Sequence, residues 1–114
     1  MLNRLPLPRI VAMCLGVALV GVVSASAQSA DAGQKVYTAQ KCSLCHSVAG
    51  VGNKKGALDG IGSKLSADDI RAWITDAPTM AAKAKADRKP PMKAYTLPKE
   101  DLDTLVGYLQ GLKK

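Results

Sequence analysis

The sequence contains one histidine, no phenylalanine and few acidic residues, and it is short. Its 114 residues include 9 acidic side chains against 16 lysines and arginines. A single histidine excludes a metal site built from several histidines, and the length excludes a multidomain enzyme. The chain has a formal charge of +7 and a hydrophobic content of 47%. The hydrophobic content is a misleading average, because the hydrophobic residues are unevenly distributed along the chain.

The first 27 residues differ in composition from the rest of the chain. No acidic residue occurs before Asp31, and a hydrophobic run of 14 residues occupies positions 10–23. The run leads to Ala25-Ser26-Ala27, which matches the A-x-A cleavage pattern of exported proteins. Because the run is too short for a comfortable membrane span, we expect a secretory signal peptide at 1–27 that is cleaved after Ala27. A retained N-terminal anchor is the alternative.

The expected mature domain, residues 28–114, has 87 residues and a net charge of +5. It keeps two of the three cysteines, because Cys14 leaves with the signal peptide, and two of the four methionines, Met80 and Met92. A domain of this size buries little surface and usually needs reinforcement from a disulfide or a cofactor. Export to the periplasm would permit either one.

Both remaining cysteines belong to the segment Cys42-Ser43-Leu44-Cys45-His46. C-x-x-C-H is the attachment signature of c-type haem. Two thiols about one helical turn apart can reach both vinyl groups of a porphyrin, and the adjacent imidazole then lies under the iron. The motif predicts one haem c bound covalently by Cys42 and Cys45, with His46 as the proximal axial ligand.

Other interpretations of these residues fit less well. A structural zinc site needs four cysteine or histidine ligands, and the mature chain has three. A thioredoxin-like redox pair belongs between a strand and a helix, and we find no convincing strand pattern. A disulfide across two intervening residues would close a very small loop and stabilise little.

Helical periodicity occurs in three places and predicts an all-α fold. Ser66 is the expected N-cap of the second helix, and Pro78 is expected to end it. The segment 79–89 is left open between a short helix and a loop. The expected helices are 31–41, which Asp31 caps, 66–77, and a third that begins near Pro98 and has an apolar stripe of Leu102, Leu105, Val106, Leu109 and Leu112.

The order of helix, haem motif, glycine-rich loop, Pro-Met segment and last helix resembles a class I cytochrome c over the whole mature chain. The resemblance implies three main helices around one haem, with Gly33 and Tyr37 of the first helix crossing Tyr108 of the last. Many members have a loop proline whose carbonyl accepts the proximal histidine's N–H. The loop Gly56-Ala57 lacks that proline, so a backbone carbonyl is expected but the acceptor stays open.

The second axial ligand follows by elimination, because the only histidine is already used. Met92 follows Pro90-Pro91, which hold the chain extended, and it precedes the last helix. We predict Met92 as the distal ligand. Met80 is the second candidate, and lysine or water are the remaining options. Either methionine could also simply fill the core.

Several hydrophobic residues are candidates for the dry pocket around the porphyrin, and each would serve equally well as ordinary core. Trp73 could also reach a haem propionate through its indole N–H. The candidates are Leu58, Ile61, Leu65, Trp73, Ile74, Leu97, Leu105, Val106 and Leu109.

The expected function is single-electron transport by a soluble periplasmic monohaem protein. Two protein ligands leave no open iron site for a substrate, so no enzymatic activity is expected. A haem subunit bound permanently to a larger dehydrogenase or oxidase is the first alternative. An enzyme or gas sensor is the second, and it requires that Met92 does not bind iron.

Basic residues cluster in the two segments expected to frame the haem crevice. They suit transient encounters with acidic-surfaced redox proteins or membrane redox complexes, although they could be only a solvated face. Nucleic acid is a poor candidate partner because the protein is exported and its basic runs lack aromatic residues. No membrane anchor is expected after cleavage. The cluster consists of Lys54, Lys55, Lys83, Lys85, Arg88, Lys89 and Lys93.

Overall fold

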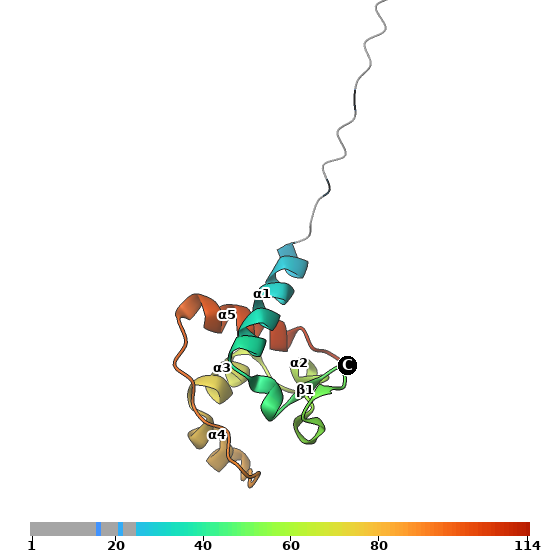
Figure 1. Cartoon of the computed structure of the whole chain (residues 1–114). Coiled ribbons are helices and arrows are strands. Elements are labelled where there is room, and N and C mark those ends of the chain that lie inside the picture. The colour runs from blue at the N-terminus through green and yellow to red at the C-terminus, as the bar shows by residue number, and fades with distance from the viewer. Residues whose placement is uncertain (1–15, 17–20, 22–24) are drawn as a thin grey trace, which may run out of the picture.

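The computed structural model describes residues 16, 21 and 25–114, so almost all of the predicted signal peptide, including Cys14, lies outside the described residues. Helices dominate the described part, in agreement with the predicted all-α class (Figure 1). None of these helices is long and apolar enough to cross a membrane. The elements are α1 (Ala25–Ala39), η1 (Cys42–Leu44), β1 (Ser47–Val48), β2 (Val51–Gly52), η2 (Lys54–Gly56), α2 (Ile61–Lys64), α3 (Ala67–Thr75), α4 (Ala77–Ala84) and α5 (Lys99–Gln110), where η marks a 3-10 turn.

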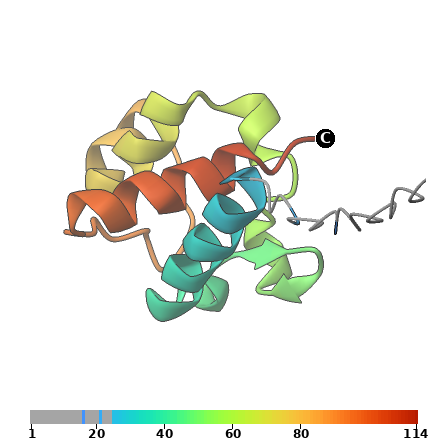
Figure 2. The ribbon, with the colours of Figure 1, turned by 90° about the horizontal axis from the view of Figure 1, so that it is seen from above.

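The first and last helices cross each other and form the centre of the fold (Figure 2). A Cβ atom on Gly33 would collide with the Cβ of Tyr108 and the carbonyl oxygen of Thr104, so only glycine permits this approach. The rings of Tyr37 and Tyr108 meet edge to face, with centroids 5.9 Å apart and planes at 64°. This crossing is the one expected for Gly33, Tyr37 and Tyr108.

The boundaries of α1 differ from the prediction. The helix begins at Ala25, so Asp31 lies inside it and the prediction that Asp31 caps it is wrong. It ends at Ala39 because Lys41 adopts a left-handed conformation (φ 57°), which α-helical hydrogen bonding does not continue through. The backbone N–H of Lys41 instead donates to the carbonyl of Thr38, three residues earlier, at 3.0 Å.

The second predicted helix, 66–77, corresponds to α3, and a separate helix, α4, begins at Ala77. Ser66 caps α3 as expected, and its hydroxyl accepts the Asp69 N–H at 3.1 Å. The expectation that Pro78 ends this helix is wrong, because α3 stops at Thr75 and Pro78 lies in the first turn of α4. Proline has no N–H to donate, and the first turn of a helix is where that loss costs nothing. The open segment 79–89 is helical only as far as Ala84.

No strand was predicted, and the structure contains a small antiparallel hairpin of β1 and β2. Ser47 pairs with Gly52 and Val48 with Val51. Strands of two residues are too short for an alternating pattern, which explains why the sequence does not reveal them. The hairpin follows directly after His46 and shapes the loop behind it.

The buried core comes mainly from α1, α3 and α5. Four of the predicted pocket residues are buried, four more are half-buried against the core, and Trp73 is half-buried. Leu112 packs against the core from beyond the end of α5. The buried core cluster is Tyr37, Ile70, Ile74, Leu105, Val106 and Leu109.

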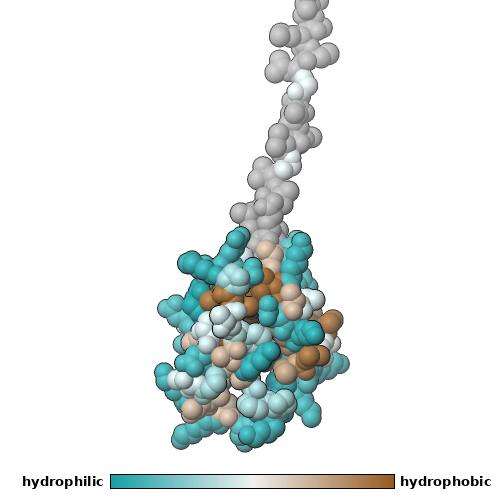
Figure 3. All heavy atoms as spheres, turned by 60° about the vertical axis from the view of Figure 1, so that its left-hand side comes forward, coloured by the Kyte–Doolittle hydropathy of each residue, from teal (hydrophilic) through white to brown (hydrophobic). Residues whose placement is uncertain are grey.

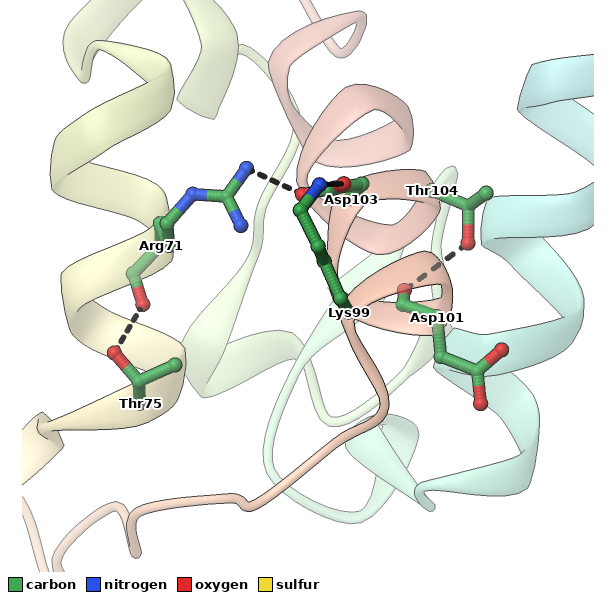
Figure 4. Close-up of polar contacts among 6 residues, drawn as sticks. All are labelled: Arg71, Thr75, Lys99, Asp101, Asp103 and Thr104. Atoms are coloured by element: carbon green, nitrogen blue, oxygen red, sulfur yellow. Dashed lines mark hydrogen bonds and ion pairs between the residues drawn. The ribbon is translucent and has the colours of Figure 1, made fainter.

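Polar contacts join the helices at their edges. Figure 3 shows a face of the molecule on which hydrophilic side chains surround smaller hydrophobic patches. Arg71 of α3 reaches Asp103 of α5 at 2.8 Å, and Lys99 reaches the same carboxylate at 2.6 Å (Figure 4). These two partners lower the pKa of Asp103 below its ordinary value. At the other end of α5, the Gly62 N–H donates to the Leu112 carbonyl at 2.8 Å and fixes α2 against the chain terminus.

Tyr37 carries an unusual buried hydroxyl, which has no hydrogen-bond partner among the described residues. Replacing Tyr37 by phenylalanine is expected to stabilise the protein by about 1 kcal/mol at pH 7, because an unsatisfied buried hydroxyl costs free energy. Burial, followed by the nearby Cys42, Tyr108 and Asp59 charges, raises the pKa of Tyr37 to about 12.

The raised pKa adds an alkaline signature to this prediction. The neutral phenol is favoured in the folded state, so its stabilising contribution is complete below the ordinary pKa of about 10 and is lost towards pH 12. Urea titrations of both proteins from pH 7 to 12 should show a smaller alkaline loss of stability for Tyr37→Phe. A clear destabilisation at pH 7 would mean that the hydroxyl has a partner in the native protein.

Candidate haem-attachment site

The Cys42–His46 segment folds as a tight turn at the end of α1. The left-handed Lys41 redirects the chain into η1, where the N–H groups of Cys45 and His46 both donate to the Cys42 carbonyl at 3.1 and 2.9 Å. Cys42 is half-buried and Cys45 is exposed, and neither forms a disulfide. The local backbone therefore presents two free thiols one helical turn apart, with the imidazole directly following.

Asn53 holds this turn in place and was not singled out from the sequence. Its backbone N–H donates to the carbonyls of Ser43 and His46 at 3.1 and 2.9 Å. Its side-chain amide donates to the Leu44 carbonyl at 3.2 Å, and its Oδ1 accepts the N–H of Lys55 at 3.0 Å. The last contact is an Asx turn, and the Asn-Lys-Lys-Gly stretch was the sequence signal that could have indicated it.

The imidazole of His46 is oriented by a backbone carbonyl. Its Nδ1 lies 2.9 Å from the carbonyl oxygen of Gly56. A carbonyl can only accept, so Nδ1 carries the hydrogen and Nε2 keeps a free lone pair. Gly56 therefore supplies the acceptor that the sequence left open, and it does so without a proline.

The surroundings of His46 and Cys42 favour the neutral forms of both side chains. Burial lowers the pKa of His46; its hydrogen bond to Gly56 opposes the shift, and the positive charge of Arg88 adds to it. Burial also raises the pKa of the Cys42 thiol. A neutral imidazole with a free Nε2 is the form of histidine that binds metal ions.

The segment 88–95 is attached to the rest of the domain at both of its ends. A Cβ on Gly56 would collide with the guanidinium of Arg88, so Arg88 lies directly against the loop that holds His46. At the other end, burial raises the pKa of Tyr95, and the charges of the nearby Cys42 and Cys45 raise it further. The Tyr95 N–H donates to the Ile74 carbonyl at 2.8 Å and anchors this end to α3.

The two candidate methionines occupy different elements. Met92 lies half-buried in the segment 88–95, between Arg88 and Tyr95. Met80 is also half-buried, in α4.

All seven residues of the predicted basic cluster are exposed, and the contact between Arg88 and Gly56 brings the two segments of this cluster together.

The residues present fit a covalently attached haem. Two free thiols one turn apart match the two thioether positions, and the hydrogen bond at Nδ1 leaves Nε2 of His46 available to the iron. A metal-binding histidine usually donates its other ring N–H, here at Nδ1, to an acceptor such as a backbone carbonyl, which fixes the orientation of the ring.

Comparison with known proteins identifies the family. A family model described as Cytochrome c matches residues 30–113, which is most of the chain. No match was found among the curated proteins or among the solved structures. Members of the matched family carry covalently attached haem c, and Cys42 and Cys45 fit its attachment motif. The chain therefore belongs to the cytochrome c family, the electron-transfer proteins with covalently attached haem c.

Proposed function

We propose that this cytochrome is an exported carrier of single electrons with one haem, for which His46 and Met92 would supply the two iron ligands. The observation that carries this proposal is the arrangement of the segment 88–95. Arg88 lies against the His46 loop, and Tyr95 packs against the same buried core as Cys42, so both ends of the segment that carries Met92 are anchored on the side of the motif.

Each residue has a defined task in this proposal. The bound haem supplies the reversible one-electron change of its iron. Cys42 and Cys45 attach the group, and the Gly56 carbonyl keeps the His46 ring in one orientation. A thioether from Met92 favours the ferrous state and so raises the potential. Two fixed protein ligands leave no position for a substrate, so we propose transport rather than catalysis.

Replacing Met92 by leucine tests the ligand assignment. The sulfur-to-iron charge-transfer band of the oxidised holoprotein should disappear and the midpoint potential should fall, because leucine has no donor atom. Met80→Leu is the matched control and should keep both the band and the potential. The opposite pattern would assign the ligand to Met80. A wild-type oxidised protein that is high-spin and lacks the band would contradict the carrier function itself.

The proposal includes export to the periplasm and cleavage after Ala27. The hydrophobic run at 10–23 and the Ala25-Ser26-Ala27 pattern support it. Cleavage at this position would remove the first three residues of α1 and leave the crossing at Gly33 intact. The intact mass of the purified holoprotein measures the cleavage position directly.

The partners that we propose are acidic-surfaced redox proteins or membrane redox complexes, met transiently. The most exposed large hydrophobic side chains among the described residues are Leu44 and Val51, at 70% and 73% exposure. They lie on neighbouring elements, η1 and β2, with Leu44 inside the attachment motif and Val51 beside it. A small apolar contact with basic residues near it suits a weak and rapid encounter. A permanent subunit of a larger complex is expected to have a large apolar surface patch, which would need more exposed large hydrophobic side chains than these two.

A further inference from the structure

Arg88 contacts the loop that supports the axial histidine, although it is exposed and far away in the sequence. Its guanidinium occupies the space where a side chain on residue 56 would begin, and glycine leaves that space open. A Cβ built on Gly56 would also lie 2.9 Å from Nδ1 of His46. The guanidinium of Arg88 and the His46 ring therefore lie beside the same small piece of backbone.

The charge of Arg88 is not neutralised by an ion pair in the described part of the chain. Both ion pairs found there use the carboxylate of Asp103, which pairs with Arg71 and Lys99. Asp59, the acidic residue nearest in sequence to Gly56, accepts the N–H of Ala49 at 2.8 Å. The positive charge of Arg88 is therefore available to act on the site beside it.

A positive charge at this position has a definite effect on reduction. When a donor protein delivers one electron, the net charge of the iron and its ligands falls by one. A nearby cation repels the more positive oxidised state more strongly and so favours the reduced state. Because Arg88 is exposed, solvent and salt weaken this interaction without changing its sign.

We propose that Arg88 is a positioning residue that packs on Gly56, steadies the carbonyl that orients His46, and raises the reduction potential of the haem through its charge. This inference rests on the proposed function, since it takes His46 as an axial ligand.

The test compares the midpoint potentials of holoprotein variants in redox titrations with mediators. Arg88→Gln should shift the reduction equilibrium about threefold to tenfold towards the oxidised form, and tenfold corresponds to about 59 mV for one electron. Arg88→Lys keeps the charge and should retain most of the potential. Lys89→Gln is the matched control, because it removes the same charge from the adjacent exposed residue.

Each outcome of this experiment decides a specific point. If Arg88→Gln leaves the potential unchanged, or lowers it no more than Lys89→Gln does, the proposal is overturned. If the midpoint potential of Arg88→Lys is as low as that of Arg88→Gln, the proposed contribution of the charge is overturned. The charge-transfer band, recorded on the same samples, tests the His46/Met92 ligation separately, so failure of the proposed function is distinguishable from failure of the role of Arg88. At high ionic strength the shift should become smaller.

Discussion

Replacing Gly33 by alanine is expected to destabilise the holoprotein by about 3 kcal/mol, a large fraction of the stability of a small domain. The added methyl group would collide with the Cβ of Tyr108 and with the backbone carbonyl of Thr104. Neither atom can move by a change of rotamer, so α1 and α5 must separate. Separation would also weaken the ring contact between Tyr37 and Tyr108.

Gly107→Ala is the control for this prediction, because it makes the same substitution on the partner helix. A Cβ on Gly107 would have no atom within 4 Å. Alanine should therefore stabilise α5 by roughly 0.5–1 kcal/mol through its better helix propensity. Urea unfolding followed by circular dichroism measures both variants. Equal effects of the two substitutions would contradict close packing at Gly33.

The double variant Cys42→Ala, Cys45→Ala is expected to lose all covalently attached haem and most of its native structure. The predicted mature domain has only 87 residues, and half-buried residues such as Leu58 and Leu97 flank its core. A domain of this size has a small core, and a covalently attached haem would supply much of its buried apolar surface. Haem staining after denaturing electrophoresis and far-ultraviolet circular dichroism measure the two losses.

Cys14→Ala provides the control, because Cys14 belongs to the proposed signal peptide and should have no part in haem attachment. This variant should keep its full content of covalent haem. The single variant Cys45→Ala separates the two thioethers, since Cys42 could still form one bond and leave partial haem staining. Haem that stays attached to the double variant under denaturing conditions would contradict the assignment of both cysteines.

Local patterns explain why much of this protein could be predicted before its structure was known. The five residues from Cys42 to His46 contain two thiols and an imidazole at a spacing set by covalent geometry, so the attachment chemistry follows from their order alone. The apolar stripe of α5 and the cap at Ser66 are equally local, because helical hydrogen bonds join residues three or four positions apart. These predictions needed no knowledge of distant contacts.

The helix boundaries that differed from prediction depend on backbone conformations that are set by packing in the folded chain. Pro78 is compatible both with the end of a helix and with the first turn of another, and the packing of α4 behind α3 decides between them. Lys41 adopts a left-handed conformation that lysine rarely takes, so the end of α1 could not be placed from propensity.

The sequence by itself therefore determined the family-defining motif and the all-α class, and its resemblance to class I cytochromes c implied the crossing at Gly33. Tertiary structure alone decided which carbonyl orients His46, how Asn53 fastens the motif and why Arg88 stands beside Gly56. The physical reason is the range of the contacts. Each of these three arrangements joins residues from separate segments, and their partners are selected by how the folded segments pack.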